Sequence, residues 1–130
     1  MTDGSGTRRQ PTPEQCQGVF RAVFEQTAVG VAQVVSRTGA FLRINRRYAE
    51  ILGYTVAEME NLTFQAITHP DDLAEDLANM QRLLAGEIRE FSMEKRYHHK
   101  DGSIVWVNLT VSPMWAIGEE PDCHLAIVEE

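Results

Sequence analysis

The order of the predicted elements indicates a single α+β domain. Two strand-like stretches come first, three or four helices follow, and three further strand-like stretches complete the chain. Three observations carry this prediction: valine-rich residues 31–35 before a turn, helix-start signals between residues 45 and 72, and alternation of apolar with polar residues after residue 90. With 130 residues, 43% of them hydrophobic and 24% charged, the chain has material for one core.

The N-terminal part predicts an amphipathic helix behind a flexible leader. Residues 1–10 are polar and glycine-rich, and Thr12 to Gln15 have the form of a capping box with proline at the first helical position. Apolar residues then recur at helical spacing: Cys16, Val19, Phe20, Val23 and Phe24. We therefore expect three parts: a leader over 1–11, a helix over 12–28 and the main domain over 29–130.

A short antiparallel hairpin and a capped helix open the main domain. Residues 31–35 and 41–44 read as its two strands, joined by a turn at 37–39. Asn45 is a suitable N-cap for a helix that Gly53 ends. Thr55 and Glu58 form a second capping box, which predicts a brief helix through residue 59.

The longest interior helix is predicted to start at His69-Pro70-Asp71-Asp72 and to stop at Gly86. Proline fits the first helical position, and acidic residues in the first turn complement the helix dipole. The expected buried stripe of this helix is Leu73, Leu77, Met80 and Leu84. After it, a hairpin turns at Asp101-Gly102, and a last strand covers 123–128. The inward-facing residues of the long strand are expected to be Val105, Val107, Leu109 and Val111.

Three segments in succession resemble the PAS sensor domain, in its bacterial signalling form of the S-box or PAS fold-3 type. They are FLRINRRYAEILGYT, the helix start THPDD, and the hairpin KDGS leading into IVWVNLTVSPM, and the resemblance covers residues 19–130. It implies a five-stranded antiparallel sheet with helices packed on one face. It also implies a sensory and dimerising module rather than an enzyme.

Composition and motifs exclude several other classes of function. A net charge of -7, without a basic stripe, disfavours nucleic acid and anionic membrane. Neither a membrane-spanning run nor a signal peptide is present in the sequence, and the separated Cys16 and Cys123 suit a reduced, cytoplasmic protein. No catalytic motif is found, and His98-His99 point to opposite sides of a strand, so no metal site is expected.

The resemblance also sets expectations for cofactors. Flavin-adduct relatives need a cysteine where this chain has Phe64, and their flavin-reading amides correspond to Val107 and Val128. Haem-bearing relatives commonly use a histidine on the long helix, and residues 71–85 contain none. Neither a flavin adduct nor histidine-ligated haem is therefore expected, and an unknown small ligand stays open.

Two polar residues interrupt the inward-facing pattern, Gln33 in the first strand and Lys95 in the third. Each must reach water, a protein partner or a ligand, and the long stem of Lys95 can snorkel past the sheet edge. With a ligand, Lys95 is expected to pair with a carboxylate or carbonyl and Gln33 to add a hydrogen bond. The pocket candidates are Gln33, Val35, Ile51, Leu77, Lys95, Tyr97, Val107, Leu109 and Val128.

An apolar surface predicts a homodimer. Its members come from the N-terminal helix and the outward side of the last strands: Val19, Phe20, Val23, Phe24, Trp106, Leu125 and Ile127. The resemblance implies that a histidine kinase or cyclic-di-GMP-type effector follows Glu130. Three functions stay open: a sensor relaying through dimer rearrangement, a small-molecule sensor with an apolar pocket, and a constitutive assembly module with a filled core.

Overall fold

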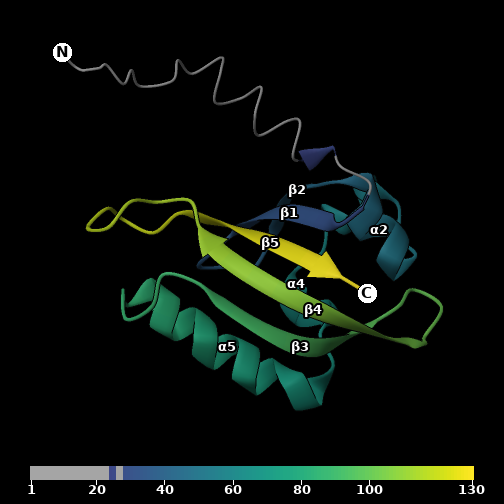
Figure 1. Cartoon of the computed structure of the whole chain (residues 1–130). Coiled ribbons are helices and arrows are strands. Elements are labelled where there is room, and N and C mark those ends of the chain that lie inside the picture. Colours follow the sequence, from purple (N-terminus) through teal and green to yellow (C-terminus); the bar gives the residue numbers. More distant parts are fainter. Residues whose placement is uncertain (1–23, 26–27) are drawn as a thin grey trace.

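The computed structural model describes residues 24–25 and 28–130, and nine helices and strands are defined within them (Figure 1). The leader and nearly all of the predicted helix over 12–28 lie outside the described residues. The elements, in chain order, are β1 Gly30–Val35, β2 Phe41–Ile44, α2 Arg46–Leu52, α3 Val56–Met59, α4 Phe64–Ile67, α5 Pro70–Leu84, β3 Phe91–His98, β4 Ile104–Pro113 and β5 Cys123–Glu129.

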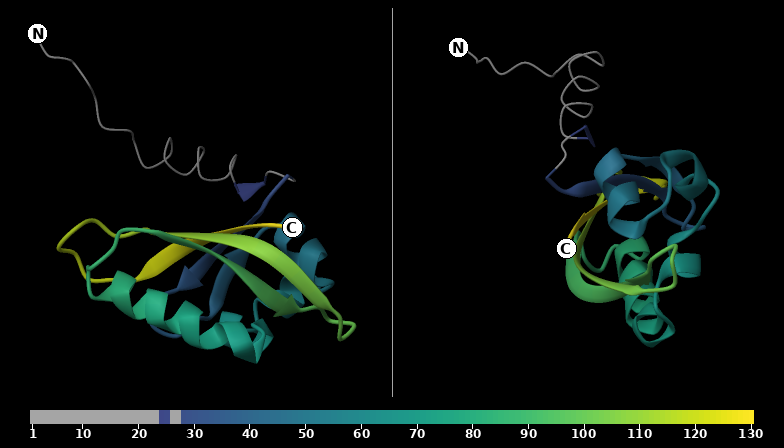
Figure 2. Two further views of the ribbon diagram at one scale, coloured as in Figure 1. Left: turned by 60° about the horizontal axis from the view of Figure 1, so that its bottom comes forward. Right: turned by 90° about the vertical axis from the view of Figure 1, so that its right-hand side faces the viewer.

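The five strands form one antiparallel sheet in the order β2-β1-β5-β4-β3. The first and last of the described strands, β1 and β5, therefore lie side by side in the interior of the sheet. The sheet curves around the helices, which all lie on its concave side (Figure 2). This arrangement confirms the predicted α+β fold with helices on one face.

The inner face of the sheet is mostly apolar, with the charged Lys95 and the polar His124 as exceptions. Strand pairing sets Met93 opposite Leu109 and Leu109 opposite Val128, and all three are buried in one core. Lys95 belongs to this face as well, opposite Val107. The predicted inward side of β4 is confirmed for residues 107, 109 and 111, while Val105 is only partly buried.

The prediction for β1 had the wrong face. Ala32 and Val34 point into the core, so Gln33 and Val35 lie on the outer face, where Gln33 is opposite Leu125. Every residue of β1 except Gln33 is apolar or glycine, so alternation does not distinguish the two faces of this strand. Both Gln33 and Val35 are half-buried.

Side-chain caps start the helices as predicted. Asn45 accepts hydrogen bonds from the backbone N–H of Tyr48 at 2.9 Å and of Val31 at 3.0 Å, so one amide both caps α2 and holds β1. The reciprocal capping box of Thr55 and Glu58 starts α3. His69 caps α5, where Pro70 takes the first helical position.

The predicted stripe of α5 is confirmed at Met80 and, as partly buried residues packed on the core, at Leu73 and Leu84, but it is wrong at Leu77. The buried residues of α5 are Asp76, Met80 and Leu83, whereas 38% of Leu77 is exposed. The inward face also includes the partly buried Leu73, so it runs at i, i+3, i+7 and i+10. Asp76 occupies the centre of this face because it pairs with the buried Lys95.

One short segment contacts both edges of the sheet. Residues 62–64 pair with the chain leading into β2, through a bridge between Ala40 and Thr63 and a bond from the N–H of Phe41 to the carbonyl of Leu62. A few residues later, Thr68 forms a bridge with Tyr97 of β3. The segment that contains α4 therefore spans the concave side from one edge strand to the other.

Candidate functional site

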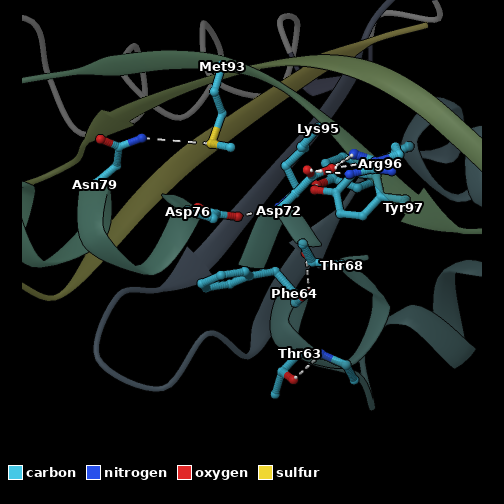
Figure 3. Close-up of polar contacts among 12 residues, drawn as sticks. Thr63, Phe64, Thr68, Asp72, Asp76, Asn79, Met93, Lys95, Arg96 and Tyr97 are labelled. Atoms are coloured by element: carbon cyan, nitrogen blue, oxygen red, sulfur yellow. Dashed lines mark hydrogen bonds and ion pairs between the residues drawn. The ribbon is translucent and has the colours of Figure 1, made fainter. Parts of the chain in front are cut away.

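The centre of the domain contains a buried ion pair. Lys95, in the middle of β3, has none of its surface exposed and pairs with the carboxylate of Asp76 on α5 (Figure 3). Burial lowers the pKa of the Lys95 ammonium, and the adjacent Asp76 carboxylate opposes that shift. Of the three outcomes expected for Lys95, water, a protein partner or a ligand, the structure therefore shows a protein partner.

Aromatic groups surround the ammonium. Its Nζ lies 5.3 Å from the ring centre of Phe64 and 4.6 Å from that of Tyr97, both suitable for cation–π attraction. The Tyr97 hydroxyl shares a 2.6 Å hydrogen bond with the hydroxyl of Tyr48. Burial raises the pKa of both tyrosines, so both hydroxyls stay protonated.

A buried histidine completes the polar centre. His124 of β5 shares a 2.8 Å hydrogen bond between its Nδ1 and the Oγ of Ser36. Burial, reinforced by the positive charge of Lys95, lowers the pKa of His124 to about 4. The ring is therefore neutral at physiological pH, and its role is structural, as a buried hydrogen-bonding partner of Ser36.

The space between these groups is nearly full. It offers only about 10 Å³ to the centre of a water-sized sphere, which is about the minimum that holds one water molecule. Drug-sized ligands occupy pockets of several hundred Å³. Its lining comes from the sheet and the helices: Val34, Phe41, Tyr48, Phe64, Asp76, Met80, Lys95, Tyr97, Leu109, Val111, His124 and Ala126.

The structure brings three of the nine pocket candidates to this cavity: Lys95, Tyr97 and Leu109. Ile51, Val107 and Val128 are buried in the core away from it. Gln33 and Val35 lie on the outer face, and Leu77 lies on the exposed side of α5. Gln33 and Lys95 therefore lie on opposite faces of the sheet and cannot share a ligand as the sequence suggested.

Sequence reasoning missed Asp76 and did not assign His124 to the cavity. The signal for Asp76 was present, because it lies three residues after Leu73 and four before Met80, on the same helical face. A carboxylate on an apolar face, opposite an inward-facing lysine, indicates a pair. His124 shares inward parity with Ala126 and Val128 in the same way.

A second ion pair lies beside the first, at the start of α5. The guanidinium of Arg96 binds both carboxylate oxygens of Asp72, at 3.0 Å and 2.9 Å, and the Arg96 backbone N–H donates to Asp72 at 2.7 Å. These bonds hold the pKa of Asp72 below its ordinary value. On the outer face, the same guanidinium lies 5.0 Å from the ring centre of Trp106.

The outer face of β4 and β5 carries three of the dimer candidates. Trp106 is 57% exposed, and Leu125 and Ile127 are half-buried on the same face. Phe24 is buried, with its ring 5.4 Å from the guanidinium of Arg43. Arg43 pairs with Gln33, so this contact places Phe24 on the outer face too. Val19, Phe20 and Val23 lie outside the described residues.

A family model for the PAS fold matches residues 41–128 of the chain. The chain belongs to the PAS family. Among solved structures, this PAS domain is similar to a domain of a sensory box sensor histidine kinase/response regulator from Geobacter sulfurreducens, with a TM-score of 0.75 and 21% identity. That match covers 92% of this chain and 97% of the other.

Two curated proteins share more of the PAS domain's sequence. A probable diguanylate cyclase of Escherichia coli, DgcE, is 39% identical over 111 residues, and the sensor histidine kinase TmoS of Ectopseudomonas mendocina is 30% identical over 111 residues. Each match covers 85% of this chain, but the chain spans only about a tenth of either relative, 10% and 11%. A PAS domain is a sensory unit and is not itself catalytic.

Within 24–25 and 28–130, no helix is long and apolar enough to cross a membrane.

Proposed function

We propose that this PAS domain is a dimerising input module of a bacterial signalling protein, with a histidine kinase or cyclic-di-GMP-type effector following Glu130. One observation carries the proposal: the same segment recurs in a probable diguanylate cyclase and in a sensor histidine kinase. A cyclase and a kinase catalyse different reactions, so the function that a shared segment serves in both is the reception and relay of a signal rather than catalysis. In that role the domain lies in the cytoplasm.

The outer face of the sheet, defined by Trp106, Leu125 and Ile127, is the proposed dimer surface. A two-fold axis through this face buries the same residues of both copies. Phe24 already lies on the outer face, beside Arg43. Residues 12–28 then cover the rest of the face, with Val19, Phe20 and Val23 as their apolar contacts, and rearrangement of this pair relays the signal.

The packed core favours relay or assembly over recognition of a small molecule. The cavity has room for about one water, and Asp76 already neutralises the ammonium that a carboxylate ligand needs. A ligand sensor needs a larger pocket with unpaired polar groups. The small-molecule function is therefore not the one that we propose.

Light scattering tests the dimer directly. We expect the full chain to be a dimer, a chain starting at residue 27 to be a monomer, and Trp106→Glu to weaken the dimer strongly. The matched control is Ile117→Glu, which places the same charge at a residue that is 83% exposed in the loop between β4 and β5. A truncated chain that remains dimeric would show that the N-terminal helix is not the main interface. An effect of the control equal to that of Trp106→Glu would refute the sheet face as the dimer surface.

A further inference from the structure

Two acids on α5 hold two neighbouring cations on β3 that point to opposite faces of the sheet. Asp72 and Asp76 are one helical turn apart, on the same side of the helix. Lys95 and Arg96 are consecutive in a strand, so Lys95 points into the core and Arg96 outward. Figure 3 shows the two acids side by side against β3. We call these two ion pairs the clasp. Its inner arm is the pair of Lys95 with Asp76, and its outer arm is the pair of Arg96 with Asp72.

Several hydrogen bonds fix the position of Arg96 in the outer arm of the clasp relative to the start of α5. Arg96 is bound through its side chain and its backbone N–H by one carboxylate, and its carbonyl accepts a hydrogen bond from the N–H of His69 at 2.9 Å. Both backbone groups face the start of α5 because β3 is an edge strand. Asp71 is a further negative group near the guanidinium, at 3.9 Å, without the bidentate geometry. A shift of α5 therefore displaces Arg96 or breaks these bonds.

The inner arm ties the same helix to the polar centre. Asp76 meets Lys95 among Phe64, Tyr97 and His124, where neither partner is exposed to water. Loss or displacement of either charge leaves the other buried without a partner, which strongly disfavours that position of the helix. A change in the core that displaces either charge therefore acts on α5, and this helix of fifteen residues connects the inner arm to the outer arm.

The outer arm ends on the proposed dimer surface. Arg96 and Trp106 are directly opposite one another in the β3–β4 pairing, with the guanidinium over the indole ring. A cation fixed over one face of the ring orients the most exposed aromatic group of the outer face. Movement of Arg96 consequently changes the charge and the position of the surface that meets the second copy.

We propose that the clasp transmits the state of the core, through α5 and Arg96, to the dimer surface around Trp106. This inference rests on the proposed dimer function, whose regulation it describes. The two states are the closed clasp of the structure and an open one in which the inner arm is broken and α5 has moved. Coupling of this kind typically changes an affinity about 5- to 150-fold.

A double-mutant cycle on the full chain tests the clasp. The inner arm is removed by Lys95→Met with Asp76→Leu, which leaves no charge in the core and so preserves folding. The outer arm is removed by Asp72→Asn. Sedimentation equilibrium gives the dissociation constant of the dimer, and Trp106 fluorescence in a Trp115→Phe background gives the local environment, since the chain has 2 tryptophans. Glu75→Gln, an exposed neutralisation on α5, is the matched control.

We expect removal of the inner arm to change the dissociation constant at least about fivefold and to shift the Trp106 emission. With Asp72→Asn already present, the same change should alter the dissociation constant less than about twofold and leave the emission unmoved. Equal effects with and without Asp72, or none at all, would overturn the clasp. An effect of Glu75→Gln as large as that of Asp72→Asn would overturn it too, because helix charge alone would then explain the data.

Failure of the dimer is distinguishable from failure of the clasp. If the unmodified chain and every variant are monomers, the proposed dimer surface is wrong. The Trp106 emission alone then tests the clasp. A shift that depends on Asp72 then supports transmission to the outer face without a second copy. A shift independent of Asp72, in a protein that dimerises as proposed, refutes the clasp and leaves the proposed function intact.

Discussion

At the scale of single residues, the burial of Lys95 is the feature with the largest energetic consequence. An ammonium away from water is tolerated only with a close counter-charge, here Asp76, and with the aromatic faces beside it. Such pairs contribute little net stability compared with apolar residues of similar volume, but removing one partner alone is costly. The pair therefore fixes the position of α5 against β3 more than it adds to the free energy of unfolding.

The Lys95→Met variant tests this view of the pair. The single change leaves the Asp76 carboxylate buried and unpaired, so the free energy of unfolding should fall by about 3–5 kcal/mol. Adding Asp76→Leu should restore it to within about 1 kcal/mol of the wild-type value. Urea unfolding of the three proteins measures both values. If the single and double variants are equally unstable, the pair is not an isolated electrostatic unit.

His124 predicts a dependence of stability on pH. Its pKa is lowered to about 4 in the folded protein, against 6.5 when exposed, so the unfolded chain binds the extra proton between these values. Stability is therefore fully present above pH 6.5 and is lost as the pH falls toward 4, by about 3 kcal/mol in total. The carboxylate of Asp72, whose pKa is also lowered, loses its contribution only at lower pH.

Urea unfolding between pH 5 and 7 isolates the histidine. In His124→Asn, whose amide can keep the bond to Ser36, the slope of stability against pH should largely disappear. His98→Gln, at the half-buried imidazole stacked on His69, is the control and should keep the wild-type slope. An unchanged slope in His124→Asn would show that another group titrates in this range.

At the scale of elements, most of the structure follows from local sequence signals. Asn45, Thr55 and His69 start three helices where their side chains predict them, and the Asp101-Gly102 turn lies between β3 and β4. The short helix α4, which Thr63 caps, was not predicted individually because four residues carry no periodic pattern.

The buried face of a strand or helix was harder to predict than its position in the sequence. In β1 the inner face has Ala32 and Val34 and the outer face has Val35 beside the single polar residue Gln33, so the alternation between the faces is weak. In α5 the apolar residues alone predict a stripe that includes Leu77, whereas the buried position is taken by Asp76. Helical spacing places Asp76 on the apolar face of α5, but the identity of its partner, 19 residues later in β3, follows only from the tertiary packing of α5 on that strand.

Two helix caps with different burial allow a matched comparison. Asn45 is buried and serves β1 as well as α2, whereas Thr55 is exposed and serves α3 alone. Asn45→Ala should lower the free energy of unfolding by about 2–3 kcal/mol, since it also leaves the Val31 N–H buried without a partner. Thr55→Ala should cost about 1 kcal/mol. Equal losses in chemical unfolding would contradict the double role of Asn45.

At the scale of the whole molecule, dimerisation should make heat stability depend on protein concentration. If two copies must separate before or during unfolding, a higher concentration favours the folded dimer by mass action, and Tm rises. The chain starting at residue 27 should have a Tm independent of concentration. Calorimetry over a hundredfold range of concentration distinguishes the two, and a constant Tm for the full chain would contradict the proposed dimer.

The segment around α4, which touches both borders of the sheet, has a consequence for solution behaviour. Strands at the border of a sheet offer free amides and carbonyls that recruit further strands and lead to fibres. Here Leu62 and Thr63 take up such groups near β2, while His69 and Asp72 take up those of Arg96 in β3. Growth by strand addition is thereby blocked at these points, which favours association through the outer face, as in the proposed dimer, over an open-ended polymer of strands.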